Sequence, residues 1–396
     1  MKLELISIGS ELLTGKTVNT NASWIGNTLL ANGYKLSYVQ TIVDNEQDIK
    51  AALELACNRA DFVITTGGLG PTGDDITKAC VAAHFGKTMQ YHADIEQELD
   101  KRFPGIPGHD NQATYPEGAI LLKNPSGTAL GFVVENKVVC LPGVPSQMKA
   151  IFEIGVLPYL KKQFPPEYVA RSVFIAGKIE NDVDPTLREL EEKFADIELG
   201  ICPSWGILSV YCVGKNTTHV DAAIMEIEKK FHDVIFSTES SDISLAVHLL
   251  LQKKKCTLAF AESCTGGYIS SQITQHSGAS DYFLGSVITY SNEAKEKLVN
   301  VAPKTLQEHG AVSEETAKEM ASGAKKALGS DCAVGITGVA GPLGGTDEKP
   351  VGTVWIALVN KENKYTTFRC TRGGDRKKII EYAANTALHM IWRECR

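Results

Sequence analysis

The chain has 396 residues, with 40 Lys and Arg against 47 Asp and Glu, which gives a formal net charge of −7. This length favours two or three domains of roughly 100–200 residues, and its 43% hydrophobic and 22% charged residues exclude a disordered or fibrous chain. No apolar run approaches the roughly 18–20 residues of a membrane span, and none of the ten cysteines is paired as CxxC, so we expect a cytoplasmic protein without a disulfide framework or a zinc cluster.

Predicted strands and helices alternate along residues 1–165. Strands are predicted at 3–8, 36–43 and 61–66, and helices at 21–32 and 47–57. Such alternation favours a parallel sheet covered by helices on both faces. The opening Met1–Gly9 carries an early Glu4 and is expected to form the first strand, not a signal peptide. Pro165 and Pro166 interrupt the pattern, because proline continues neither a helix nor a strand ladder.

Two further segments follow. Residues 166–242 are predicted to form strands at 171–176, 197–202, 207–213 and near 235, with helices at 185–194 and 220–231. Residues 243–396 begin with a helix at 243–252 and alternate again from Thr257. The three segments carry net charges of −3, −8 and +4. The acidic middle segment also has no GXXG loop, which argues against nucleic-acid binding.

The most informative stretch of the first segment is the loop Gly67–Thr77, which follows a predicted strand. Its paired glycines, Gly67 and Gly68, allow backbone N–H groups to approach a phosphate at the start of a helix near Asp74. Asp74 and Asp75 would repel that phosphate unless a divalent cation lay between them. The alternative is that Asp74 caps the helix and Asp75 complements its dipole.

This segment resembles the molybdopterin-binding (MoaB/MogA-like) domain of the CinA family. The matching motifs are Ile8–Gly15, Asn19–Asn21, Val43–Asn45, Gly67–Thr77, Asn124–Ala129 and Leu141–Pro145. The resemblance implies metal-assisted hydrolysis of the pyrophosphate of ADP-ribose. It places Asp44, Asp74 and Asp75 near a divalent metal and the phosphates, with Glu11 in the same cleft.

The chain departs from the pattern of this domain at Asn19, where Asp is usual, and at Leu130, where Pro is usual. Residues 166–242 resemble the small KH-like linker domain of full-length CinA proteins. That resemblance implies a linker or dimerisation role, so we expect a homodimer.

A second cluster of reactive residues lies in Thr257–Gly267, which reads as a buried strand followed by a polar turn and a helix. A nucleophile at such a turn is exposed, and helix N–H groups there can stabilise an oxyanion. Ser263 and Cys264 are both candidates. A catalytic cysteine usually needs a histidine partner, and the nearest in sequence, His248 and His276, fall in a predicted helix and a loop.

A serine can instead use a lysine base, and Lys295 follows the predicted strand 285–289. This lysine must be neutral to accept a proton. Its pKa would have to fall from ~10.4 to about 7–8, so the side chain should be buried or near another cation. The alternative is an ordinary exposed lysine at the start of a helix.

The third segment resembles the PncC-type domain of CinA proteins. The matching motifs are Ala261–Gly267, Thr289–Lys295, Gly310–Ser313, Ile336–Pro342, Lys349–Val354 and Gly374–Arg376. The resemblance implies an amidohydrolase that removes the amide of nicotinamide mononucleotide, with Ser263 as the acyl-forming nucleophile and Lys295 as its general base. Ammonia leaves, and water then releases nicotinic acid mononucleotide. No cofactor is expected for this activity.

The remaining motifs suit a phosphorylated substrate. The glycine loop Thr337–Gly341 can approach a phosphate through its backbone, and Arg376 can supply a bidentate contact. The alternatives are turn geometry for the glycines, and an ion pair of Arg376 with Asp375 or Glu381. The expected substrate contacts are Glu262, Thr265, Gly266, Gly267, Tyr290, Asn292, Thr337, Gly338, Gly341 and Arg376.

We therefore predict an α/β protein with two three-layer αβα domains, 1–165 and 243–396, joined by a small α+β (KH-like) module, 166–242. The principal function expected is amide hydrolysis of a pyridine nucleotide. Two alternatives remain open: a metal-dependent ADP-ribose pyrophosphatase in the first domain, and a non-enzymatic scaffold associated with competence or DNA damage. No membrane or nucleic-acid partner is expected.

Overall fold

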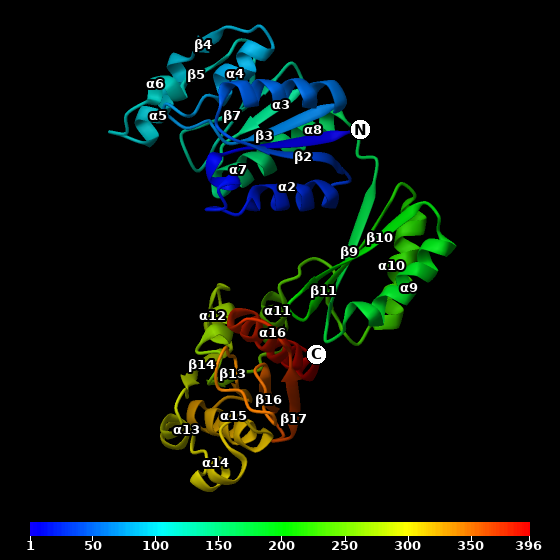
Figure 1. The fold of residues 1–396 in the computed structure, drawn as a ribbon, viewed down its shortest axis with the longest axis vertical. Coiled ribbons are helices and arrows are strands. Elements are labelled where there is room, and N and C mark those ends of the chain that lie inside the picture. The colour runs from blue at the N-terminus through cyan, green and yellow to red at the C-terminus, as the bar shows by residue number, and fades with distance from the viewer. The chain divides into compact units, whose positions relative to one another are not determined.

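A computed structural model describes residues 1–396, which divide into two compact units (Figure 1). The first unit consists of Met1–Ala170 with Gly214–Thr217, and the second of Arg171–Val213 with Thr218–Arg396. Both units mix helices with sheets. No helix of the chain is both long enough and apolar enough to cross a bilayer.

The first unit is built on a six-stranded sheet in the order β2-β1-β3-β8-β7-β6. Its strands are β1 (Leu3–Ile8), β2 (Leu36–Ile42), β3 (Phe62–Thr66), β6 (Ile120–Leu122), β7 (Gly131–Val134) and β8 (Val138–Leu141). The first four strands in this order are parallel, as predicted, but β7 runs antiparallel to both of its neighbours, β8 and β6. The reason is local. A tight turn joins β7 to β8, with Glu135 and Asn136 both at positive φ, and so short a turn connects only antiparallel strands.

Helices cover both faces of this sheet. They are α1 (Ser10–Leu13), α2 (Thr20–Ala31), α3 (Glu46–Arg59), α4 (Thr77–His84), α5 (Ala93–Arg102), α6 (His109–Gln112), α7 (Pro145–Ile151), the π-helical turn η1 (Phe152–Val156) and α8 (Leu157–Gln163), while β4 (Met89–Tyr91) and β5 (Thr114–Pro116) form a separate ladder. Leu3 and Leu5 of β1 pack into one apolar cluster with Ile25 of α2. Ile6 and Ile8 pack into a second cluster with residues of α3 and α4. The unit therefore has the expected three layers.

Within the second unit, a four-stranded sheet has the order β10-β11-β9-β12. Its elements are β9 (Val169–Ala176), α9 (Glu180–Lys193), β10 (Ile197–Ser204), β11 (Ile207–Gly214), α10 (Thr217–Phe231) and β12 (Ile235–Ser237). This is the α+β arrangement expected from the sequence. Helix α9 begins before the predicted start at Pro185, because the Asp182 carboxylate accepts a hydrogen bond from the Ile179 N–H (3.0 Å) and caps the earlier turn.

The remainder of the second unit is a five-stranded sheet in the order β14-β13-β15-β16-β17. Its strands are β13 (Leu258–Glu262), β14 (Phe283–Ile288), β15 (Cys332–Gly338), β16 (Thr353–Val359) and β17 (Tyr365–Thr371). Its helices are α11 (Ile243–Lys254), α12 (Tyr268–Thr274), the 3-10 turn η2 (Ala279–Asp281), α13 (Asn292–Val299), α14 (Pro303–His309), α15 (Glu314–Leu328) and α16 (Arg376–Cys395). Strands β14, β13 and β15 are parallel, and β16 and β17 antiparallel. One apolar cluster packs α11, α12 and α16 on the sheet, and a second packs α15 on it.

Gly323 marks a close approach on which this packing depends. It lies inside α15, where alanine ordinarily stabilises a helix by about 1 kcal/mol relative to glycine. Here a Cβ would lie 1.8 Å from the Val299 carbonyl oxygen. We therefore expect Gly323→Ala to destabilise the second unit by about 2 kcal/mol or more, measured as a lower Tm. Lys326→Ala, on the exposed side of the same helix, should not lower the Tm, and an unchanged Tm for Gly323→Ala would contradict the prediction.

Candidate active site

The carboxyl end of β13 places a serine at a sharp turn. The strand is buried along its whole length, and the N–H of Ser263, the next residue, donates to the carbonyl of Ile336 in β15 (3.0 Å). Gly266 and Gly267 then adopt φ values of 57° and 98°, a conformation that favours glycine, before α12 begins. Ser263 therefore lies where the parallel strands end, which is where open α/β sheets bind ligands.

Lys295 lies against this serine. Its Nζ is 3.0 Å from Ser263 Oγ, and it also donates to the carbonyl oxygens of Thr289 (2.9 Å) and Tyr290 (3.5 Å). The lysine side chain is 1% exposed, so the alternative of an ordinary surface lysine is wrong. Helix α13 begins at Asn292 and turns Lys295 inward.

Burial lowers the pKa of Lys295, because charging an amine away from water is costly and no carboxylate lies close enough to compensate. A neutral amine has two N–H groups and one lone pair. The carbonyls of Thr289 and Tyr290 can accept the two N–H groups, which leaves the lone pair for the Ser263 hydroxyl. The arrangement can therefore move a proton from the serine to the lysine.

Cys264, the other candidate nucleophile, has a different environment. It is buried, and burial raises the pKa of its thiol to about 12, so little thiolate exists near neutral pH. His248 hydrogen-bonds Tyr282 (3.1 Å), and its ring lies against that of His276, with the centroids 5.1 Å apart. Neither histidine hydrogen-bonds Cys264. The structure thus places a lysine amine beside Ser263 and gives Cys264 no histidine partner.

Glu262 is not available to a substrate, contrary to the expectation from the sequence. It is fully buried, and its carboxylate accepts hydrogen bonds from the N–H groups of Gly267, Ile269 and Ser270 (3.0–3.2 Å). These are amides at the start of α12, which would otherwise be unpaired. The expectation that this helix stabilises an oxyanion is therefore also wrong, because Glu262 already occupies its donors.

Other donors in the turn remain free. Of the two residues after Ser263, Thr265 has an N–H that donates to no protein acceptor, and Cys264 has an N–H that contacts only its own sulfur. The Thr265 hydroxyl is buried and also lacks a partner. The turn therefore offers unpaired donors next to the serine.

Ser263 and Lys295 open onto a cavity of about 210 Å³. The predicted residues in its walls are Tyr290, Asn292, Thr337, Gly338 and Arg376, while Thr265, Gly266, Gly267 and Gly341 lie outside the lining. The Thr337 hydroxyl donates to the Ala311 carbonyl (2.7 Å), so it holds the loop before α15. Ala311 and Val312 of that loop also line the cavity. They were missed from the sequence, although the Gly310–Ser313 motif was the available signal.

Arg376 begins α16 and reaches into the same cavity. Its guanidinium donates to the Gly341 carbonyl (2.8 Å) and to the Tyr290 hydroxyl (2.9 Å). The alternative ion pairs with Asp375 and Glu381 are not formed, because both carboxylates pair with lysines of the same helix. The arginine is thus held by neutral acceptors and keeps an uncompensated positive charge.

The predicted residues of the first unit gather at the carboxyl ends of its parallel strands. The Ser10 N–H and hydroxyl donate to the Asp44 carboxylate (2.8 and 3.1 Å), and the Gly67 N–H donates to the Leu141 carbonyl (2.9 Å). Gly67 has a φ of 107°, and a Cβ there would lie 2.0 Å from the Ile8 carbonyl oxygen. Gly67 is therefore required by the way these loops meet.

The acidic side chains of this unit do not form an assembled metal site. The Thr72 hydroxyl lies 2.5 Å from a carboxylate oxygen of Asp74 and 2.5 Å from one of Asp75, so its single proton is shared between the two acidic side chains. No three of the four predicted carboxylates are gathered closely enough to share an ion. Helix α4 begins at Thr77, so Asp74 is not its cap. Gly68 lies in the same loop, at a φ of 65°.

Glu11, Asn19 and Lys78 of the first unit have three different environments. Glu11 lies exposed in α1. The Asn19 side chain accepts a hydrogen bond from the Ala22 N–H (3.0 Å) and caps α2, so asparagine serves a structural role at this position. Lys78, which was missed from the sequence, is buried and donates to the Asn111 carbonyl (2.7 Å), and burial lowers its pKa to about 8.

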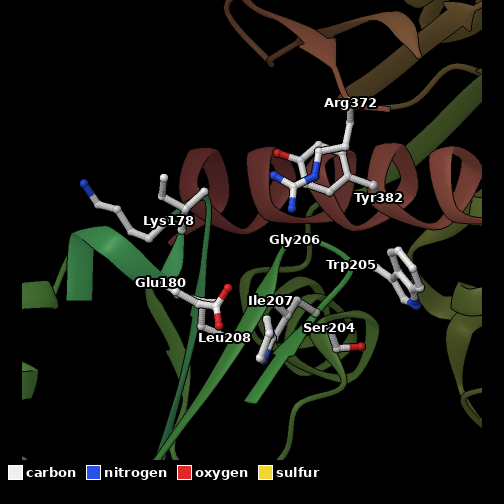
Figure 2. A pocket seen from close by; sticks show the side chains of 11 residues that line it. Lys178, Glu180, Ser204, Trp205, Gly206, Ile207, Leu208, Arg372 and Tyr382 are labelled. Atoms are coloured by element: carbon white, nitrogen blue, oxygen red, sulfur yellow. The ribbon is translucent and has the colours of Figure 1, made fainter. Parts of the chain in front are cut away.

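A larger cavity, of about 330 Å³, lies elsewhere in the second unit (Figure 2). It is lined by Trp205 and Gly206, between β10 and β11, together with Arg372 and Tyr382, and Gly206 lies against the Tyr382 ring. None of its serine, lysine or acidic side chains hydrogen-bonds another. The contact between Ser263 and Lys295, rather than cavity size, makes the smaller cavity the candidate active site.

Comparison with known proteins covers nearly the whole chain. The family model of the "CinA C-terminal domain" matches residues 240–395, and that of a "Probable molybdopterin binding domain" matches residues 4–162. A "Putative competence-damage inducible protein" of Thermoanaerobacter pseudethanolicus is 39% identical over 99% of this chain and 97% of its own. A "CinA-like protein" of Syntrophus aciditrophicus is 37% identical over 99% and 98%. The solved "competence/damage inducible protein CihA from Agrobacterium tumefaciens" is 35% identical over 39% of this chain and 96% of its own, with a TM-score of 0.37.

Proposed function

The chain belongs to the CinA protein family, and from this premise we propose that residues 243–396 hydrolyse the carboxamide of nicotinamide mononucleotide. The products are nicotinic acid mononucleotide and ammonia. The observation that supports this most directly is the 3.0 Å contact between Lys295 Nζ and Ser263 Oγ, with the lysine buried and no carboxylate beside it. A buried lysine with a lowered pKa can act as the base for a nucleophilic serine.

The proposed reaction divides into acylation and deacylation. As Ser263 Oγ attacks the carboxamide carbon, its proton passes to the Lys295 amine and the carbonyl oxygen becomes an oxyanion. The N–H groups of Cys264 and Thr265, which donate to no other residue, are the donors available to that oxyanion. The Lys295 ammonium then protonates the leaving nitrogen, which departs as ammonia. Water attacks the acyl-serine with Lys295 again as base, which releases the carboxylate and restores the serine hydroxyl.

Arg376 is our candidate for the phosphate contact. It lines the cavity that contains Ser263, and its charge is not cancelled by a carboxylate. Two neutral acceptors, the Gly341 carbonyl and the Tyr290 hydroxyl, hold its guanidinium in place. Arginine in a fixed orientation suits the bidentate recognition of a phosphate.

Arg376→Ala is expected to raise the KM for nicotinamide mononucleotide by about 10–100-fold, the value of one or two charge-assisted hydrogen bonds, with a much smaller effect on kcat. Steady-state ammonia release measures both constants. Nicotinamide riboside, which lacks the phosphate, serves as the control substrate and should show little change between the wild type and the variant. An equal loss on both substrates would mean that Arg376 maintains the shape of the cavity and does not bind phosphate.

The decisive experiment incubates the purified chain with nicotinamide mononucleotide in the presence of EDTA. Ammonia release that survives the chelator supports the amidase. Cleavage of ADP-ribose that requires added Mg²⁺, without ammonia release, would support the pyrophosphatase instead. Absence of both activities would support a non-enzymatic scaffold.

The pyrophosphatase is the second candidate because the glycine loops of the first unit meet at the carboxyl ends of its parallel strands. The carboxylates there are not assembled around a common point, so we derive no step through a metal. Asp74→Asn should leave ammonia release unchanged if the two sites act independently.

A further inference from the structure

Three cysteines from distant parts of the sequence meet at the amino ends of β13 and β15, away from Ser263. Cys256 precedes β13, Cys332 begins β15 and Cys395 ends α16. Their sulfur atoms all lie within 4.8 Å of one another, with 3.6 Å between those of Cys256 and Cys332. No other three cysteine, histidine or acidic side chains of the chain are gathered so closely.

We propose that Cys256, Cys332 and Cys395 bind a thiophilic metal ion, either Zn²⁺ with water as a fourth ligand or three-coordinate Cu⁺. Soft thiolate ligands select these ions, with metal–sulfur distances of about 2.3 Å. Sulfur atoms at that distance are about 3.8 Å apart in a tetrahedral site and about 4.0 Å apart in a trigonal one. The observed separations, 3.6 Å for one pair and at most 4.8 Å for the others, bracket both values.

The backbone beside two of these ligands is firmly held. The Thr257 N–H and hydroxyl both donate to the Asp331 carboxylate (2.9 Å each), and the Asp331 N–H donates to the Thr257 hydroxyl (2.8 Å). The Cys332 N–H donates to the Thr257 carbonyl (3.0 Å). Ligands fixed in advance lose little entropy when the ion binds. Cys395 closes the site from the C-terminal end of α16, where the helix dipole favours a cation.

The three thiols already interact as a group. Hydrogen bonds from Cys332 and Cys395 lower the pKa of the Cys256 thiol, and the same contacts raise the pKa values of Cys332 and Cys395. Metal binding replaces these thiol contacts with metal–sulfur bonds and displaces the thiol protons. The charged groups that act on the cluster are Asp331, Lys325 and Lys361.

This site would be structural. It lies at the opposite end of β13 and β15 from Ser263, and it connects the start of both strands to the end of α16. An ion that binds only the folded chain stabilises it by mass action. Metal binding is therefore expected to raise the Tm of the second unit.

The test uses the full chain, reduced and freed of metal. Co²⁺ is the spectroscopic probe, and Zn²⁺ and Cu⁺ are added in separate experiments. We expect one ion per chain, sulfur-to-cobalt charge-transfer absorption, release of protons on binding, and protection of three of the ten thiols from a thiol reagent. The ion that protects these thiols at the lower free concentration is the one the site selects.

Cys395→Ser is the first variant, because its position at the end of the chain makes it least disruptive to folding. Loss of one ligand in three is expected to weaken Co²⁺ affinity by at least about 100-fold, and Cys332→Ser should do the same. Cys202→Ser, which removes an exposed cysteine of β10, is the matched control and should leave the affinity unchanged.

Two results would overturn the proposal. One is an unchanged Co²⁺ affinity in the folded Cys395→Ser variant. The other is a result in which no ion protects the three thiols and mild oxidation joins Cys256 and Cys332 in a disulfide. The cluster would then be a redox pair and not a metal site.

Discussion

Ser263→Ala is expected to lower kcat for amide hydrolysis of nicotinamide mononucleotide by about 10⁴-fold or more. The reason is that Ser263 is the side chain that hydrogen-bonds the Lys295 amine, so no other nucleophile can pass its proton to that base. The KM should change little, because the hydroxyl is a small part of the cavity wall. Ammonia release measures both constants, and an unchanged Tm shows that the variant is folded.

Cys264→Ala is the matched control, one residue further along the same turn. It is expected to keep most of the activity, because the buried thiol has a raised pKa and no histidine partner. The substitution also preserves the backbone N–H that we assign to the oxyanion. An inactive Cys264→Ala beside an active Ser263→Ala would transfer the role of nucleophile to the cysteine.

Lys295→Met is expected to reduce kcat to a similar degree, because methionine fills the space of the lysine stem but cannot accept a proton. In the wild type, kcat/KM should rise with pH and level off above the pKa of Lys295, which burial places below the ordinary ~10.4. A pH–rate profile measures this. A kcat/KM that stays constant as the pH rises toward the pKa of Lys295 would contradict the assignment of Lys295 as the base.

The same lysine predicts a pH dependence of stability. The folded chain disfavours the charged amine, so the unfolded chain holds its proton to higher pH, and the free energy of unfolding rises between the folded and unfolded pKa values. Lys295→Met removes this dependence. The Tm of the variant minus that of the wild type should therefore decrease as the pH rises, whereas Lys297→Met, exposed on the same helix, should show no such trend.

The turn around Ser263 could be predicted because its signals are local. An apolar run at 258–262, a polar cluster and paired glycines describe a strand, a turn and a helix without reference to distant residues. The burial of Lys295 could not be predicted in this way. The local sequence of a lysine at a helix start is the same whether its side chain faces water or the sheet. The packing of α13 on the rest of the unit determines that Lys295 is buried.

The hydrogen bonding of Glu262 could not be predicted from the sequence for a related reason. A carboxylate at the end of a strand can face a ligand or the next helix, and only the folded turn shows that the Glu262 carboxylate binds the amides of α12.

The cysteine cluster could not be predicted from the sequence either. Cys256, Cys332 and Cys395 follow no motif spacing, and it is strand pairing and the packing of α16 that bring their sulfur atoms together. The antiparallel direction of β7 depends on the short turn that joins it to β8, whereas the parallel core follows from the alternation of strands and helices alone.

The uncompensated charge of Arg376 has a consequence for how a substrate enters. Its guanidinium lies in the wall of the cavity that contains Ser263, where only neutral acceptors hold it, so the positive end of the site is fixed in place. A molecule with a phosphate at one end and an uncharged amide at the other is drawn in with the phosphate toward Arg376 and the amide left for the serine. The reverse orientation would forgo this attraction, which is strong where water screens it poorly. Charge therefore selects the reactive orientation before any contact with the nucleophile is made.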